Sequence, residues 1–165
     1  MKKIKVGVIG VGHLGSEHAR IYAGMKNAAL IGVADTRKDR ANEVAAQYGV
    51  ESSADYTSFF GKVDAVSIAV PTHLHYQIAK DFLGRNVHVL LEKPIAGTLA
   101  EAGKLVSLSD KKKIILQVGH VERFNSALRH IEKKISNPMF IECHRLGPFQ
   151  KRGTEVGVVL DLMIH

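Results

Sequence analysis

The sequence lacks a second cysteine and any long apolar run. Its single cysteine, Cys143, has no partner for an internal disulfide, and this usage is typical of a reducing compartment. No stretch approaches the roughly 20 apolar residues that a membrane-spanning helix requires. The amino-terminal MKKIKVGVIGVG places lysines before apolar residues, as a signal peptide does, but glycines interrupt the run and no small-residue cleavage pattern follows. We therefore expect a cytoplasmic protein with no membrane partner.

Aromatic residues are also scarce, at 6% of the chain, which argues against a nucleic-acid surface although the formal net charge is +7. The lysines and arginines are spread over many segments. The densest run, three lysines at 111–113, falls where a helix is predicted to end, and there it complements the helix dipole. We expect no nucleic-acid partner, whereas a basic surface still favours small molecules that carry phosphate.

The sequence does contain a regular alternation of strand-like and helix-like segments. With 165 residues, 45% of them hydrophobic, the chain has room for one full domain. Five short, nearly continuously apolar segments, as in strands covered on both faces, lie at residues 3–9, 29–35, 64–70, 87–92 and 114–119. Helical patterns lie between them at residues 16–25, 38–48, 75–83 and 99–110. This alternation predicts an α/β fold with a doubly wound parallel sheet.

The pattern changes after Gly119. Apolar residues at helical spacing predict a helix over 124–135, Pro138 follows it, and residues 140–146 read as a strand. A last helix is predicted to begin near Val156. We place a domain boundary here, between residues 1–121 and the start of a second layer at 122–165. An uncovered strand near Phe140 would invite pairing with another copy of the chain.

The first chemical motif is the glycine-rich turn GVGHLG after the first predicted strand. Gly10, Gly12 and Gly15 let the backbone turn sharply and approach a pyrophosphate at the start of a helix that also holds His13 and Leu14. Asp35 follows Gly15 by 20 residues, at the end of the second strand, where its carboxylate can accept hydrogen bonds from ribose hydroxyls. The alternative, a tight turn that binds nothing, explains the glycines but not Asp35. Together these residues predict a dinucleotide site.

Asp35 and Arg37 point to different cofactors. A carboxylate repels the 2′-phosphate of NADP, whereas an arginine two residues later can pair with that phosphate. Arg37 can equally be an exposed charge at a helix start. We expect NAD, with NADP as the alternative.

The second motif is Glu92-Lys93-Pro94, at the end of a predicted buried strand. Pro94 cannot continue a central strand, so the strand stops there. Lys93 is thereby placed at the carboxyl edge of the sheet, where ligands bind in open α/β folds. By itself, Lys93 could equally be a solvated lysine after a strand.

Five segments, taken in order and spacing, resemble the Gfo/Idh/MocA family of NAD(P)-dependent sugar and polyol oxidoreductases: GVIGVGHLG, VPTHLHYQIA, LLEKPIAGTLAEA, GHVERFN and DLMIH. The resemblance implies a Rossmann domain over residues 1–121, and over residues 122–165 the start of a truncated α+β substrate domain. Family members are about twice this length, so we expect this 165-residue chain to be inactive alone. We also expect the full-length protein to be a homo-oligomer.

The resemblance also assigns roles to single residues. Lys93 matches the family's active-site lysine, and Asp161 with His165 matches its D-x-x-x-H pair. An imidazole has an unperturbed pKa of roughly 6.5, suited to taking a hydroxyl proton near neutral pH. The implied cofactor contacts are completed by Pro71, Thr72, His75, Glu92 and His120.

Two alternatives concern the segment PTHLH. Thr72 could instead cap the helix that follows it. His73 and His75 could suggest a metal, but no cysteine or carboxylate cluster completes a site, so we expect none.

The segments from GHVERFN to DLMIH resemble more narrowly those bacterial members that oxidise the 3-hydroxyl of UDP-N-acetylglucosamine. Arg145, Lys151 and Arg152 could supply charge for its diphosphate, or could be solvated loop charges. A different functional class is a non-catalytic NAD(P)-binding module, such as a redox sensor or a scaffold. Such a module would share the glycines and Asp35, but it would not need Lys93, Asp161 and His165 together.

Overall fold

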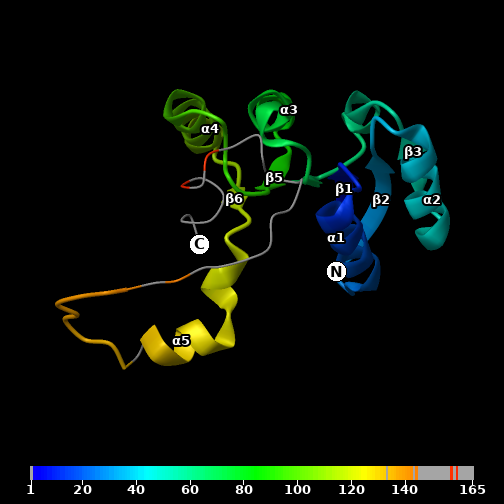
Figure 1. Cartoon of the computed structure of the whole chain (residues 1–165). Coiled ribbons are helices and arrows are strands. Elements are labelled where there is room, and N and C mark those ends of the chain that lie inside the picture. Colours follow the sequence, from blue (N-terminus) through cyan, green and yellow to red (C-terminus); the bar gives the residue numbers. More distant parts are fainter. Residues whose placement is uncertain (1, 133, 143, 145–156, 158, 160–165) are drawn as a thin grey trace. The chain divides into compact units, whose positions relative to one another are not determined.

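The computed structural model describes residues 2–132, 134–142, 144, 157 and 159. The chain divides into two compact units, residues 1–118 and residues 119–165 (Figure 1). The first unit contains the predicted sheet and most of the residues that the sequence singles out.

Six parallel strands form the sheet of the first unit, in the order β3-β2-β1-β4-β5-β6. The strands are β1 (Ile4–Ile9), β2 (Ala28–Ala34), β3 (Glu51–Ser53), β4 (Ala65–Ile68), β5 (His88–Leu91) and β6 (Leu116–Val118). The chain winds outward from β1 to β3 and then outward again from β4 to β6. Ligands of such sheets bind outside the carboxyl ends of the strands where the direction of winding changes, here between β1 and β4. The predicted doubly wound α/β fold is confirmed.

Four helices connect the strands: α1 (His13–Gly24), α2 (Lys38–Tyr48), α3 (Thr72–Gly84) and α4 (Leu99–Lys112). Right-handed connections that run in opposite directions along a sheet place their helices on opposite faces. Accordingly α1 packs with α2, and α3 packs with α4 (Figure 1). A short 3-10 helix, η1 (Tyr56–Phe59), follows β3.

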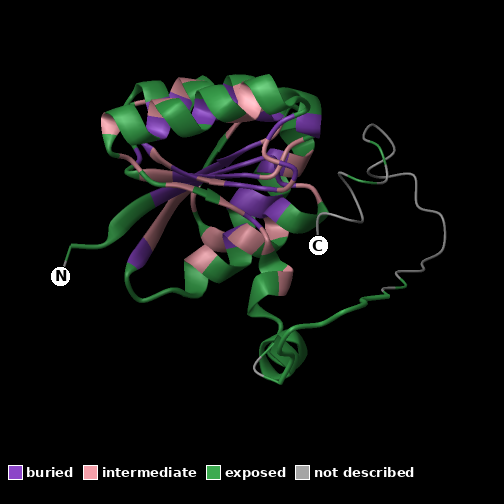
Figure 2. Ribbon diagram, turned by 90° about the vertical axis from the view of Figure 1, so that its left-hand side faces the viewer, coloured by how far each residue is buried: buried purple, intermediate pink, exposed green. Residues whose placement is uncertain are grey.

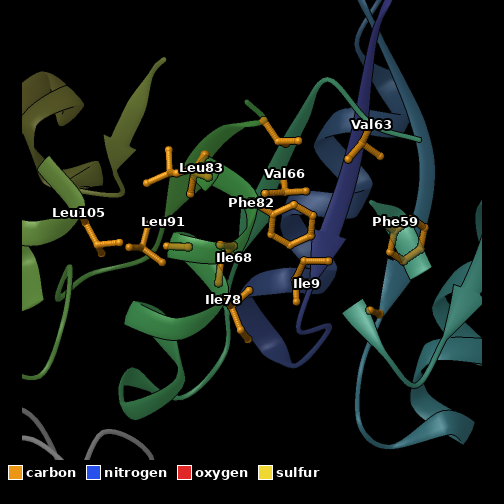
Figure 3. Packing of buried hydrophobic residues seen from close by; sticks show 14 residues of the cluster. Ile9, Phe59, Val63, Val66, Ile68, Ile78, Phe82, Leu83, Leu91 and Leu105 are labelled. Carbon is orange, nitrogen blue, oxygen red and sulfur yellow. The ribbon is translucent and has the colours of Figure 1, made fainter. Parts of the chain in front are cut away.

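The largest buried cluster lies between the sheet and the layer of α3 and α4. Phe82 and Leu83 of α3 meet Ile68 of β4 and Leu91 of β5, and Leu105 reaches them from α4 (Figure 3). Each side chain of this size contributes roughly 1.5–3 kcal/mol when it is fully buried. A second cluster lies under α1 and α2 and includes Val8, Val33 and Val44. Both faces of the central strands are therefore covered, and the strands are largely buried (Figure 2).

The observed bounds of the helices and strands can be compared with the bounds predicted from the sequence. The five predicted strands are confirmed to within two residues at each end, and α2 is confirmed in full. Helix α1 begins at His13 rather than at residue 16, because the glycine turn leads straight into the helix, with Gly12 as its N-cap. Helix α3 likewise begins at Thr72 rather than at residue 75. Strand β3 was not predicted, since its sequence, Glu-Ser-Ser, is short and polar at the edge of the sheet.

The described residues of the second unit hold a 3-10 helix, η2 (Val121–Phe124), and α5 (Ser126–Glu132). The predicted helix over 124–135 was too long at both ends. The side-chain oxygen of Asn125 accepts a hydrogen bond from the N–H of Ala127 and so caps a helix that begins at Ser126, and Lys134 and Ile135 lie outside the helix. No residue of α5 is buried (Figure 2).

The strand predicted over 140–146 is wrong for the residues that the structure describes there. Phe140, Ile141, Glu142 and His144 adopt no regular secondary structure, and Phe140 is exposed. The prediction gave weight to β-branched and aromatic residues, but a strand also needs a neighbour to pair with. The helix predicted near Val156 lies outside the described residues. The assignment of residues 122–165 to the start of a substrate domain stays a prediction.

Candidate cofactor site and active-site lysine

The three glycines of the turn after β1 have different physical roles. Gly10 has φ 82°, and a Cβ there would lie 2.5 Å from the carbonyl oxygen of Ala69. A Cβ on Gly15 would lie 1.8 Å from the carbonyl oxygen of Gly10, so α1 can approach the turn only without a side chain. Gly12 has no atom within 4 Å of its Cβ position. Two glycines therefore serve the packing of the turn, and the third keeps open space beside it.

The amino terminus of α1 is available to an anion. Gly12 is the N-cap, it provides no side-chain cap, and the first turn carries no acidic residue. The first N–H groups of a helix, here at His13 and Leu14, have no acceptor within the helix. Together with the helix dipole, they suit the binding of a phosphate group.

Asp35 is tied to this turn by its carboxylate. One oxygen accepts a hydrogen bond from the main-chain N–H of Val11 at 3.0 Å, and the other accepts from the N–H of Arg37 at 3.0 Å. The side chain is only 11% exposed. The side chain of Arg37 is 66% exposed, and its Nε lies 3.6 Å from a carboxylate oxygen of Asp35. At that distance and exposure the ion pair is weak, and Arg37 can reorient.

A cavity of about 380 Å³ lies beside the turn. Five of the predicted residues line it: Gly10, Gly12, Asp35, Arg37 and Pro71. Its apolar wall includes Ala54, Tyr56, Leu74 and Ile78. Ligand sites typically combine such an apolar wall with a few placed polar groups. The arrangement can hold the adenosine portion of a dinucleotide, with the ribose beside Asp35.

Other predicted cofactor residues of the first unit do not line this cavity. They are His13, Leu14, Gly15, Thr72, His75, Glu92 and Lys93. A second hollow of about 210 Å³, over parts of β4 and β5, includes none of the residues that the sequence singles out. The cavity beside the glycine turn is therefore the better candidate for the cofactor.

Thr72 and His75 are buried in the first turns of α3. Thr72 is the first residue of the helix, Pro71 is the N-cap, and no side chain caps this end, so the reading of Thr72 as a cap is wrong. His75 places Nδ1 2.7 Å from the carbonyl oxygen of Pro94 and Nε2 2.9 Å from that of Val70. Both ring nitrogens thus face main-chain oxygens. This geometry assigns His75 to holding two loops rather than to touching a ligand.

Glu92 and Lys93 follow β5, at the same edge of the sheet as the glycine turn. Glu92 is buried and Lys93 is partly buried. The carboxylate of Glu92 lies 3.3 Å from Nε2 of His18 and accepts the main-chain N–H of Lys93 at 3.3 Å. Burial raises the pKa of Glu92, but the hydrogen bond and charge of His18, with the N–H and charge of Lys93, lower this pKa below its ordinary value. Glu92 is therefore a buried carboxylate and not a group on the cavity wall.

Two contributors to the site were missed in the sequence. His18 lies one turn after Gly15 and could have been noticed as a polar residue on the inner side of α1. Arg40, on α2, donates from Nε to the carbonyl oxygen of Val11 and from Nη2 to the Oγ of Ser16, both at 3.0 Å. These two hydrogen bonds connect the glycine turn to α2 and stabilise it. No local pattern marks this role of Arg40, because Val11 and Ser16 lie more than 20 residues away in the sequence.

The remaining predicted residues lie in the second unit or outside the description. His120 is the N-cap of η2. Asp161 and His165 lie outside the described residues. Within the part of the chain that is described, no group of three or more histidine, cysteine, aspartate or glutamate residues could hold a metal ion. None of the helices in that part is long and apolar enough to cross a membrane.

Comparison with known proteins gives a consistent result. Residues 4–120 match the family described as "Oxidoreductase family, NAD-binding Rossmann fold". UDP-N-acetylglucosamine 3-dehydrogenase of Acidithiobacillus ferrooxidans is 37% identical over 166 aligned residues, which cover 100% of this chain and 52% of that protein. Inositol 2-dehydrogenase 1 of Saccharopolyspora erythraea is 32% identical, over 86% of this chain and 46% of that protein.

Solved structures agree with these matches. The crystallised A. ferrooxidans enzyme, GnnA, superimposes with a TM-score of 0.90 over 100% of this chain and 54% of its own, at 37% identity. Scyllo-inositol dehydrogenase of Lactobacillus casei, solved with bound NAD(H) and scyllo-inositol, gives a TM-score of 0.75 at 26% identity, over 80% of this chain and 40% of its own. The chain thus spans about half the length of the relatives that it matches. The predicted resemblance is confirmed: the chain belongs to the Gfo/Idh/MocA oxidoreductase family, whose matched domain is an NAD-binding Rossmann fold.

Proposed function

We propose that the whole protein containing this chain is an NAD-dependent dehydrogenase that oxidises a secondary hydroxyl of a sugar or nucleotide sugar. The observation that carries the proposal is that one edge of the sheet gathers three elements. These are the glycine turn after β1, Asp35 after β2 and Lys93 after β5. A dinucleotide that extends along this edge from Asp35 past the turn would bring its reactive end toward Lys93.

The chain's own groups account for cofactor binding. The N–H groups at the start of α1 would bind the pyrophosphate, and the open space at Gly12 lets it approach the backbone. Asp35 keeps acceptor capacity for the ribose hydroxyls after its two main-chain hydrogen bonds. Its charge would repel a 2′-phosphate, and the exposed Arg37 offsets that repulsion only partly. NAD is therefore the proposed cofactor and NADP the weaker alternative.

Bound NAD would supply a hydride acceptor. The chemistry then requires three roles from side chains, which we assign to Lys93, His165 and Asp161. Lys93 would donate a hydrogen bond to the substrate oxygen and stabilise the negative charge that develops there. His165 would accept the hydroxyl proton, and Asp161, four residues earlier, would orient the imidazole or bind a sugar hydroxyl. His120, Thr72 and His75 would support the nicotinamide side of the site, with His75 acting through the loops that it holds.

The substrate proposal comes from the relatives. The A. ferrooxidans protein that matches the whole of this chain is named for the 3-hydroxyl of UDP-N-acetylglucosamine, whereas the two other relatives are named for inositols. The match to the first extends through the segments on both sides of Arg145 and Lys151. We therefore propose UDP-N-acetylglucosamine as the substrate, within the wider class of sugars and nucleotide sugars.

The test uses the whole protein with NAD or NADP and a panel of UDP-N-acetylglucosamine, myo-inositol and scyllo-inositol. Absorbance of the reduced nicotinamide reports turnover, and calorimetry reports cofactor binding. We expect NAD reduction with the nucleotide sugar. Reduction with an inositol alone would replace the proposed substrate and keep the enzyme class. Cofactor binding with no oxidation of any sugar would instead identify a non-catalytic binding module.

A further inference from the structure

A short chain of buried polar side chains connects α1 with the main chain of Lys93. His18, on the first turns of α1, places Nδ1 2.6 Å from the Oγ of Ser67 on β4. Its Nε2 lies 3.3 Å from one carboxylate oxygen of Glu92. The other oxygen of Glu92 accepts the main-chain N–H of Lys93 at 3.3 Å. Only two side chains therefore separate the helix that follows the glycine turn from the backbone of the proposed active-site lysine.

The ionised state of Glu92 determines which groups donate in this chain. Glu92 is 8% exposed, yet His18 and Lys93 hold its pKa below the ordinary value of 4.5, so it is a carboxylate at neutral pH. A carboxylate only accepts hydrogen bonds, so Nε2 of His18 must donate to it. If the Nε2 donor of His18 were lost, one oxygen of the buried Glu92 carboxylate would lose its hydrogen bond, and the folded protein would be destabilised.

The surroundings of His18 hold the ring in the orientation that Glu92 requires. Ser67 is fully buried, and its hydroxyl also hydrogen-bonds to the hydroxyl of Tyr22. Burial raises the pKa of Tyr22 and the hydrogen bond with Ser67 lowers it, with a net pKa above the ordinary one. The contact between Ser67 and Nδ1 at 2.6 Å holds the ring of His18 with Nε2 toward Glu92.

We propose that His18 is a positioning residue for Lys93. It holds the carboxylate of Glu92, and through it the main chain at Lys93, at a fixed place relative to the glycine turn. The inference deepens the proposed function and rests on Lys93 being the active-site lysine. His75 holds the other side of the same segment through the carbonyl oxygen of Pro94 at 2.7 Å. The segment that carries the lysine is thus fixed from α1 and from α3.

Two substitutions of similar size separate positioning from mere packing. In His18→Gln the amide nitrogen falls near the Nε2 position and can still donate to Glu92. In His18→Asn the shorter amide falls near Nδ1, so it can reach Ser67 but not Glu92. His88→Asn is a matched control, because the Nδ1 of His88 accepts a main-chain hydrogen bond from Ile115 at the opposite end of the same strand.

The first readout is amide hydrogen exchange of the peptide that contains Lys93, measured in the whole protein. We expect His18→Asn to speed exchange at this amide about fivefold to tenfold, because the bond from the Lys93 N–H to Glu92 is weakened and not removed. His18→Gln should stay within about twofold of the wild type, and His88→Asn should leave this peptide unchanged. Unchanged exchange in His18→Asn, or an equal increase in both His18 variants, would overturn the proposal.

The second readout compares the effect on kcat with the effect on the Kd for NAD. His18→Asn should lower kcat about tenfold to a hundredfold and leave the Kd for NAD within about threefold, while His18→Gln restores most of kcat. Equal losses of kcat in both variants would contradict positioning. If His18→Asn does not fold, Ser67→Ala takes its place: it removes the partner that orients the ring and should raise exchange at Lys93 about twofold to threefold, and no change would count against the proposal.

The two hypotheses can fail separately. The exchange experiment needs no substrate, so it tests the connection from His18 to Lys93 even if no sugar is oxidised. Conversely, sugar oxidation that survives Lys93→Met would remove the proposed role of Lys93 and leave the exchange result intact.

Discussion

The carboxylate of Asp35 accepts a hydrogen bond from the main-chain N–H of Val11 at 3.0 Å, so the end of β2 is joined directly to the glycine turn after β1. One side chain thereby does two things. It fixes the turn that would bind the pyrophosphate, and it places a negative charge beside the cavity wall where the ribose would lie.

Replacement of Asp35 should therefore weaken cofactor binding more than a surface substitution does. We expect Asp35→Ala to lower NAD affinity about tenfold to a hundredfold, since it removes charged hydrogen bonds both to the ribose and to the turn. The affinity ratio of NAD to NADP should also fall, because the repulsion of a 2′-phosphate is lost. Calorimetric titration of both cofactors measures these effects. Asp39→Asn, at an exposed carboxylate on α2, is the control, and an equal loss there would contradict the assignment.

Alanine at Gly12 and alanine at Gly15 should have opposite effects. Since the Cβ position of Gly12 is open, Gly12→Ala should change the free energy of unfolding by less than about 0.5 kcal/mol, yet reduce NAD affinity about tenfold by occupying the space that the pyrophosphate needs. A Cβ at Gly15 would meet the Gly10 oxygen at 1.8 Å, so Gly15→Ala should destabilise the fold by about 2 kcal/mol or more.

Thermal unfolding and NAD titration of the same samples check this pair. Gly24→Ala, at the far end of α1 where a Cβ also meets open space, should change neither property greatly. Normal NAD binding by Gly12→Ala would show that the cofactor does not approach the turn.

The stability of the fold should depend on Glu92 at acid pH. The pKa of Glu92 is lowered in the folded protein from its ordinary value of 4.5. A carboxyl group with a lowered folded pKa stabilises the protein above its unfolded pKa, and this contribution is lost as the pH falls through the folded pKa. The free energy of unfolding should therefore decline below pH 4.5 in the wild type, and decline less steeply in Glu92→Gln.

Urea unfolding at a series of pH values gives these slopes. Glu17→Gln, at an exposed glutamate on α1, should follow the wild-type slope. Parallel curves for the wild type and Glu92→Gln would show that Glu92 has the same pKa in both states.

Arg40 offers a test of how firmly the glycine turn must be held. Arg40→Met should reduce NAD affinity about threefold to tenfold, because the turn loses two hydrogen bonds at Val11 and Ser16. Arg40→Lys should rescue little, since a single ammonium cannot reproduce the two-pronged contact. Arg20→Met, at an exposed arginine on α1 that pairs with Glu17, is the matched control. Unaltered affinity in Arg40→Met would mean that the turn is held by its glycines alone.

The sequence predicted those parts of the fold that depend on local pattern. Continuous apolar runs predicted β1, β2, β4, β5 and β6, because strands buried on both faces have few polar positions. It did not predict β3, whose Glu-Ser-Ser pairs at the edge of the sheet with β2 and whose place is set by that neighbour. Phe140 and Ile141 led to the opposite error: their β propensity predicted a strand, but no partner strand lies beside them among the described residues.

The candidate site also contains residues that could be predicted from the sequence and residues that could not. The glycine turn, Asp35 and Lys93 could be predicted because spacing along the chain places them at strand ends. The roles of His18, Ser67 and Arg40 could not be predicted, because they come from contacts across the fold, although His18 could have been noticed as a polar residue on the inner side of α1. Leu74 and Ile78 lie in an ordinary helical pattern, and only the fold brings them to a cavity that Ile9 of β1 and Ala34 of β2 also line.

The most direct test of the central claim compares NAD reduction by the wild type, Lys93→Met and Lys26→Met in the whole protein, with UDP-N-acetylglucosamine as the substrate. Lys26 is an exposed lysine in the turn after α1 and serves as the control. We expect Lys93→Met to lower kcat about a hundredfold to ten-thousandfold while the Kd for NAD stays within about threefold. Lys26→Met should behave as the wild type. Undiminished NAD reduction by Lys93→Met would contradict the account.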